Sequence, residues 1–183
     1  IRSSGAIDLF RKLIKKINIP VLMATSIGDI VPTTDEHYYG NFGIFGGRAG
    51  NYIVQNCDLI IAFGCRLSFK QIGFNYQYFA TQAKKIVVDI DKSELSKPTQ
   101  QIDIPICCEL KELFEEMLQH EIRTTEMEDN WPIYCNDLRE RYPIYNKKYS
   151  NSTCVNQYFI TKELKRILPA DATIVVGNSV ACV

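Results

Sequence analysis

Four short, almost continuous apolar runs divide this sequence, and each has the length of one β-strand. They cover residues 19–24, 58–63, 85–90 and 104–107. Segments with helical character lie before, between and after them. Because strands that are buried on both faces need no polar alternation, this order predicts a parallel sheet covered by helices on both sides. The expected fold class is therefore α/β, with an open, doubly wound sheet.

The predicted helices rest on apolar side chains that recur every three or four residues. Residues 6–17 show this spacing, with Ser3 or Ser4 as the expected cap and Asn18 at the end of the helix. Further helices are expected at 48–56, 109–120 and 156–167, a loop at 25–40, and a last strand at 173–176.

The composition changes after residue 120, where Glu, Thr, Asn, Arg and Tyr become frequent. We therefore predict a central α/β domain over residues 1–120, a linker over 121–153, part of it helical, and the start of a second α/β domain over 154–183. The sequence opens without Met and ends seven residues after the last predicted strand. We expect it to be a piece of a longer protein.

Charge and cysteine content exclude several classes of function. Lys and Arg together number 21, as do Asp and Glu, so nothing favours a nucleic-acid partner. No apolar run reaches the roughly 18 residues of a membrane span. The seven cysteines contain no C-x-x-C pair and only two histidines accompany them, which disfavours a metal site. The sequence thus predicts a cytoplasmic protein with reduced, buried thiols and neither a membrane nor a nucleic-acid partner.

Three segments that follow strands or precede helices have the residue types of a nucleotide site. The glycine-rich stretch 40–47 precedes a helix, and glycines let backbone N–H groups approach a phosphate. Residues 64–66 (Gly-Cys-Arg) follow one strand, and 89–91 (Asp-Ile-Asp) follow the next. An arginine can pair with a diphosphate, and an acid at a strand end can accept hydrogen bonds from ribose.

Each of these segments also has a purely structural interpretation. The glycines can serve tight packing, Arg66 can form an ion pair, and Asp89 or Asp91 can cap the turn at 92–95. The sequence shows no catalytic Ser–His–acid or Cys–His grouping. His37 is expected in a loop and His120 at a helix end.

A longer pattern resembles a known family. Its elements are Gly43-x-x-Gly46, Asn51, the run 56–66, the run 85–97, Ile19-Pro20-Val21, and Tyr38-Tyr39-Gly40. In this order they resemble the central domain of thiamine-diphosphate-dependent enzymes of the acetolactate synthase family. Residues 175–183 are similar to the first strand and loop of the same family's diphosphate-binding domain.

The resemblance implies a Rossmann-like central domain between a pyrimidine-binding and a diphosphate-binding domain, in a homo-oligomer. It implies a parent enzyme that decarboxylates a 2-keto acid and transfers the product, with thiamine diphosphate and Mg²⁺ bound outside this chain. The chain itself is then expected to hold no catalytic residue and no metal ligand. The family's first strand, which precedes the equivalent of Ile1, is absent here. We expect residues 173–176 to fill the resulting gap in the sheet.

The central domain of this family holds FAD in some members, ADP in others and no nucleotide in the rest. Carried over by motif, the contacts fall on Gly43, Ile44, Phe45, Gly64, Cys65, Arg66, Asp89, Ile90 and Glu109. The family's flavin binders usually have acidic residues soon after the arginine, but residues 67–70 of this chain include none. They also usually have a G-x-G where residues 26–28 of this chain are Ser-Ile-Gly. These departures disfavour FAD in this chain.

Two other functions remain open from the residues alone. One is a stand-alone module that binds FAD, ADP or NAD, and the other is a structural domain that packs catalytic domains together. Apolar surfaces that meet sister domains in the family are expected to make the isolated chain self-associate.

Overall fold

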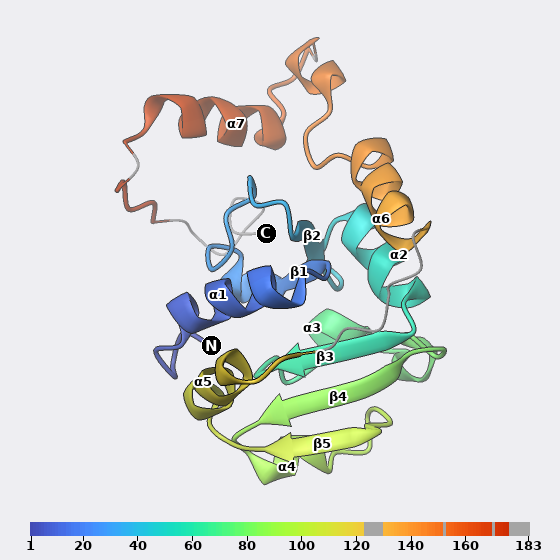
Figure 1. Ribbon diagram of the computed structural model, residues 1–183. Helices are drawn as coiled ribbons and strands as arrows, with labels where there is room; N and C mark the ends of the chain where they lie inside the picture. Colours follow the sequence, from blue (N-terminus) through green and yellow to red (C-terminus); the bar gives the residue numbers. More distant parts are fainter. Residues whose placement is uncertain (123–129, 152, 170, 176–183) are drawn as a thin grey trace. The chain divides into compact units, whose positions relative to one another are not determined.

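The computed structural model describes residues 1–122, 130–151, 153–169 and 171–175 (Figure 1). The chain divides into two compact units, residues 1–141 and 142–183. This division does not test the domain limits expected from the sequence, and these limits stay predictions. Among the described residues, no helix is both long and apolar enough to cross a membrane.

The first unit holds every strand found in the described part of the chain. The strands are β1 (Val21–Ala24), β2 (Tyr38–Phe42), β3 (Leu59–Phe63), β4 (Lys84–Asp89) and β5 (Ile104–Cys107). Its α-helices are α1 (Ile7–Ile17), α2 (Arg48–Asn56), α3 (Phe69–Ile72), α4 (Lys92–Leu95), α5 (Leu110–Gln119) and α6 (Asn130–Arg141), with 3₁₀ turns η1 (Thr25–Ile27) and η2 (Tyr76–Tyr78). The second unit contains η3 (Lys147–Asn151) and α7 (Gln157–Ile167).

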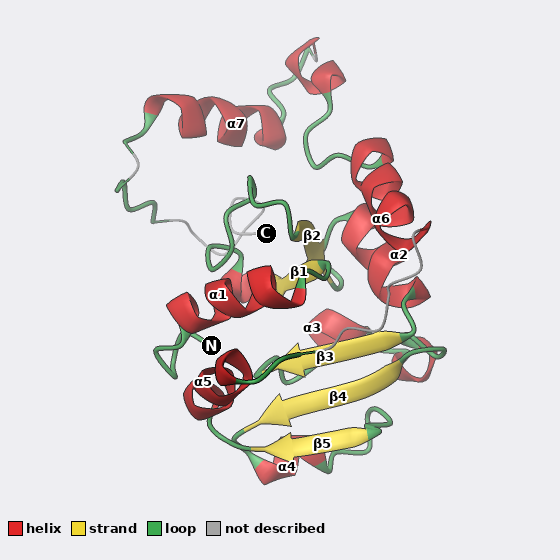
Figure 2. Cartoon of the chain, viewed as in Figure 1, coloured by secondary structure: helices red, strands yellow, loops and turns green. Residues whose placement is uncertain are grey.

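All described strand pairs are parallel, as predicted (Figure 2). They form two sheets, β1–β2 and β3–β4–β5, and no described strand joins β1 to β3. The α/β class is confirmed, and the division matches the gap that the resemblance led us to expect.

Residues 173–175 do not fill that gap, so this prediction is wrong. They form no strand, and the side chains of Ile174 and Val175 are 61% and 91% exposed. The segment belongs to the second unit, whose described residues include no strand with which it could pair. Val176 lies outside the described residues.

Helix α1 ends where the sequence predicts but does not begin with the predicted cap. Asn18 adopts the left-handed conformation (φ 55°), and its N–H donates to the carbonyl of Ile14. At the other end the N-cap is Ala6, without a side-chain hydrogen bond. Ser4 instead donates its hydroxyl to the carbonyl of Ile1, so neither serine caps the helix.

The predicted loop 25–40 is too long, because β2 begins within it at Tyr38. Pairing with β1 overrides the loop-like composition of this stretch. Gly40 takes a φ of +110°, which glycine adopts without strain. The helix expected within the linker also differs, since α6 begins at Asn130, before the apolar spacing that suggested it.

The core occupies both faces of the larger sheet. Val88 of β4 belongs to a cluster with α1 and α5, including Phe10 and Phe114. Its neighbour Val87 belongs to a second cluster, with Val54 of α2. Because adjacent strand residues point to opposite faces, β4 is covered on both sides. This is the doubly wound arrangement that the apolar runs predict.

Candidate functional site

The carboxyl ends of β3, β4 and β5 lie side by side, because the strands pair in register. Phe63 is opposite Val88, and Asp89 is opposite Cys107. The residues that follow these ends include Gly64, Ile90 and Glu109, so the structure brings these predicted positions to one edge of the sheet. We call this edge the β3–β5 edge.

Gly64 stands directly after β3 in a left-handed conformation, with a φ of +56°. Its N–H donates to the carbonyl of Val88 at 2.8 Å. A Cβ atom here would lie 3.0 Å from Cδ1 of Leu110, the first residue of α5. Glycine adopts this turn without strain, and its lack of a Cβ also suits the close approach of Leu110.

Asp89 and Asp91 have different roles at this edge. Asp89 is 7% exposed, and its Oδ1 accepts a hydrogen bond from the N–H of Asp91 at 3.0 Å. Asp91 caps α4 by accepting from the N–H of Ser93 at 2.9 Å, as its structural interpretation predicts. The side chain of Ile90 is 67% exposed.

Arg66, whose side chain is 73% exposed, forms an ion pair with Glu94, as its structural interpretation predicts. Its Nε and Nη2 donate to Oε1 of Glu94 at 2.9 and 2.6 Å. Lys97 donates to Oε2 of the same carboxylate at 2.8 Å and also to the carbonyl of Arg66. Hydrogen bonds from Lys97 and Arg66 lower the pKa of Glu94. Sequence reasoning gave no role to Glu94 or Lys97. They lie about 30 residues from Arg66 along the chain, so no local pattern indicates their contact with it.

The backbone around Arg66 carries strain. Arg66 and Leu67 have φ values of 54° and 44°, a region that residues with a Cβ seldom adopt. Leu67 is fully buried, which holds the turn in place. Cys65 is largely buried as well, and burial raises the pKa of its thiol, so it is not an activated nucleophile.

The glycine-rich loop uses its N–H groups within the fold. Four of them donate to protein acceptors at 2.8–3.0 Å: Gly43 to Oδ1 of Asn51, Ile44 to the carbonyl of Lys70, Gly46 to that of Gly43, and Gly47 to that of Asn41. No described hydrogen bond joins this loop to the β3–β5 edge. The packing interpretation of the glycines is therefore supported: Gly43 and Ile44 lie against α3, and the Phe45 side chain is 49% exposed.

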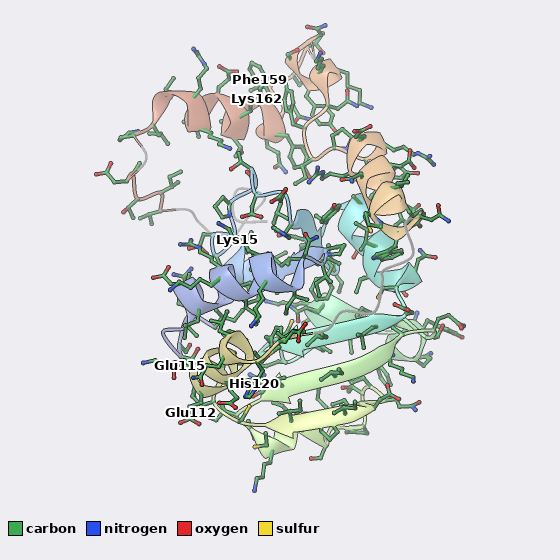
Figure 3. The ribbon with its side chains drawn as sticks, viewed as in Figure 1. Lys15, Glu112, Glu115, His120, Phe159 and Lys162 are labelled. Carbon is green, nitrogen blue, oxygen red and sulfur yellow. The ribbon has the colours of Figure 1, made fainter. Side chains whose placement is uncertain are left out.

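The histidines and thiols form no reactive group in the described part of the chain. His120, labelled in Figure 3, follows α5, and its Nε2 lies 2.7 Å from Oε1 of Glu116. The described residues contain no cluster of three or more His, Cys, Asp or Glu that could hold a metal ion. The prediction of buried thiols is wrong for Cys107 and Cys154, which are exposed.

A second polar region lies at the amino ends of β1 and β2. His37 is 6% exposed, and its Nδ1 donates to Oδ1 of Asp35 at 2.9 Å. Its Nε2 lies 3.1 Å from Oδ1 of Asn18. A cavity of about 280 Å³ opens beside these groups and is also lined by Asn136 and Arg139 of α6. The sequence gave no sign of this cavity, because the segment before β2 and helix α6 are about 100 residues apart along the chain.

We expect acid to weaken the fold through Asp35. The backbone N–H and ring of His37 both donate to Asp35, which lowers the pKa of this carboxyl group. A carboxylate with a depressed folded-state pKa stabilises the fold above its unfolded value of about 4, and this stability is lost as the pH falls through the folded value. Asp35→Asn should lower the unfolding free energy at pH 7 and flatten its decline below about pH 4.

Urea unfolding between pH 3 and 7, followed by Trp131 fluorescence, measures this effect. Asp58→Asn is the matched control, since the Asp58 side chain has no hydrogen bond or ion pair among those described. An Asp35→Asn variant with the same acid dependence as the unsubstituted protein would contradict the prediction.

The parallel α/β unit, with glycine and acid residues at its strand ends, places the chain among the doubly wound α/β domains. Residues 1–117 match the family described as "Thiamine pyrophosphate enzyme, central domain". The chain belongs to this family, which confirms the resemblance seen in its motifs.

Among curated proteins, the chain is similar to a "Probable acetolactate synthase large subunit" of Methanocaldococcus jannaschii, with 36% identity over 63% of the chain and 19% of the relative. It is also similar to "Acetolactate synthase" of Mycobacterium bovis, with 31% identity over 94% of the chain and 28% of the relative. The chain thus spans less than a third of the length of these relatives.

Proposed function

We propose that the whole protein is a thiamine-diphosphate-dependent enzyme of the acetolactate synthase type, which decarboxylates a 2-keto acid and transfers the product. The observation that carries this proposal is the match to "Acetolactate synthase" of Mycobacterium bovis, which extends over 94% of the chain and therefore beyond the central domain. When bound, thiamine diphosphate supplies the electron sink for the carbanion formed by decarboxylation.

Within that enzyme, we assign this chain a structural role as the central domain with its linker. The resemblance implies that the catalytic residues and the Mg²⁺ ligands lie in sister domains. The residues that the chain itself offers form a packed core on both faces of the larger sheet. We further propose that the enzyme is a cytoplasmic homo-oligomer in which the central domain packs against the pyrimidine-binding and diphosphate-binding domains.

The residues present do not fit the phosphates of FAD or ADP. Four N–H groups of the glycine-rich loop already have protein acceptors. The Arg66 guanidinium is bound to Glu94. Asp89 has the position of a ribose acceptor at the β3–β5 edge, but a ribose contact alone does not bind a dinucleotide. The structural role is therefore favoured over the stand-alone FAD- or ADP-binding module.

Assay of the full-length protein tests the proposed activity. With thiamine diphosphate and Mg²⁺ present, we expect it to consume pyruvate or a related 2-keto acid, and omission of either cofactor should abolish turnover. The isolated 183-residue chain is the control and should be inactive with the same additions. A folded, cofactor-loaded protein that consumes no 2-keto acid in a panel of substrates would contradict the proposal.

Calorimetric titration of the full-length protein with ADP and with FAD separates the structural role from the nucleotide-binding one. We expect no saturable binding below about 1 mM for either nucleotide. Tight binding that Asp89→Asn abolishes would overturn this expectation and place a nucleotide at the β3–β5 edge.

A further inference from the structure

A cavity of about 220 Å³ lies between the glycine-rich loop, α2 and α3 in the first unit. The apolar part of its wall comes from Ile44 of the loop, Val54 of α2 and Ile72 of α3, together with Phe79. None of the residues that line it is charged. Because its volume is below the roughly 300–1,000 Å³ of small-molecule sites, it suits a single side chain rather than a cofactor.

The two segments that form most of this wall, residues 40–48 and 66–79, also carry large exposed side chains. These are Ile44, Phe45, Phe69, Phe74 and Tyr78, with exposed fractions between 48% and 78%. Neither segment contains an Asp or a Glu, so covering them desolvates no carboxylate of their own. Their cations, Arg48, Arg66 and Lys70, have long side chains that keep the charge in water. Exposed apolar surface gathered in this way marks an interaction site.

Phe74 is the most exposed of these side chains, and its position is fixed. It is 78% exposed, and its ring stacks on that of Phe69 with 5.3 Å between the centroids. Gly73, directly before it, lines the cavity and has a φ of +78°, which glycine adopts without strain. A protruding aromatic ring therefore lies directly beside a recess that can hold one. Such a preorganised ring loses little conformational entropy when it binds.

From this arrangement we infer that the surface is a two-fold contact between two copies of this chain, in which Phe74 of each protomer enters the cavity of the other. A contact about a two-fold axis needs one patch that carries both the protruding group and its recess, and here they adjoin at Gly73. An aromatic anchor in a desolvated pocket supplies much of the binding energy of an interface. The inference rests on the proposed homo-oligomer, for which it names a contact surface, but not on the proposed enzyme activity.

Sedimentation velocity of the full-length protein over a dilution series tests this contact. We expect Phe74→Ala to raise the dissociation constant of one association step at least about 100-fold, because the anchor is lost on both sides of the two-fold axis. The products should have half the mass of the unsubstituted oligomer. Ile133→Ala is the matched control, at an exposed apolar residue of α6 outside this surface, and should associate like the unsubstituted protein.

A second variant separates the ring from the recess. Ile44→Trp places a larger side chain at the cavity but keeps Phe74, and it should dissociate as well. In an equal mixture of the two variants, the Phe74→Ala chain offers an open cavity to the Phe74 ring of the other chain. One of the two contacts is then restored, so the mixture should associate at least about tenfold more tightly than either variant alone. Native mass spectrometry identifies the mixed species, since one substitution lowers the chain mass and the other raises it.

The inference is overturned if both variants associate like the unsubstituted protein, or if their mixture is no tighter than its components. It is also overturned if Phe74→Ala keeps the mass of the oligomer but destabilises the fold, because a sister domain of the same chain would then cover the surface. A full-length protein that is monomeric at about 100 μM would reject both this contact and the proposed homo-oligomer. Turnover of a 2-keto acid by such a monomer would leave the proposed activity standing.

Discussion

Phe114→Ala is expected to lower the free energy of unfolding of the first unit by about 3–5 kcal/mol. Phe114 of α5 is fully buried. Its ring centroid lies 5.1 Å from that of Phe63 and 5.8 Å from that of Phe10. The substitution removes contacts to both β3 and α1 and leaves a cavity in the cluster that joins α1, α5 and both sheets. A loss of this size is a large part of the usual 5–15 kcal/mol of a domain.

Urea unfolding monitored by Trp131, which lies on α6 of the same unit, measures this loss. Phe74→Ala is the matched control, since the Phe74 side chain is 78% exposed and stacks on Phe69 at the surface. It should cost less than about 1 kcal/mol. Equal losses in the two variants would show that the aromatic cluster does not hold the unit together.

Gly46→Ala is the second substitution with a large expected effect. A Cβ at Gly46 would lie 2.5 Å from the backbone carbon atoms of Phe42 and 2.7 Å from the carbonyl oxygen of Asn41. Backbone cannot move aside as a side chain can, so β2 and α2 must separate. We expect a loss of about 3 kcal/mol in unfolding free energy, at the upper end of overpacking effects.

The neighbouring glycine supplies the control. A Cβ at Gly47 would meet nothing within 4 Å, and this residue has an extended, unstrained backbone as the N-cap of α2. Gly47→Ala should change the unfolding free energy by less than about 1 kcal/mol. If the two alanine variants are equally stable by thermal and urea unfolding, close packing is not the reason for glycine at position 46.

The elements that the sequence predicts best are those with a strong local pattern. Helix α2 has the predicted limits, residues 48–56, and β5 the predicted limits, 104–107. Apolar runs also identified β3 and β4 to within one or two residues. Strand β2 was missed because its segment, Tyr-Tyr-Gly-Asn-Phe, contains turn-forming residues, and only pairing with β1 makes it a strand.

The candidate site was predictable only in part. Chain order placed Gly64 and Asp89 at the ends of parallel strands, which bring such positions to one edge, and the family resemblance added Glu109. Whether Arg66 or the glycine-rich loop is free for a ligand depends on hydrogen-bond partners elsewhere in the chain, namely Glu94, Asn51 and Lys70. No local pattern encodes those partners.

The sequence by itself determined the α/β class, the parallel direction of the strands and the family, because apolar periodicity and motif order are local properties of the chain. The tertiary structure alone decided that the strands divide into two sheets and that four of the loop's N–H groups already have acceptors. It also decided that Arg139 shares a cavity with Glu36. Those features depend on which distant residues meet, and that is set by packing in three dimensions.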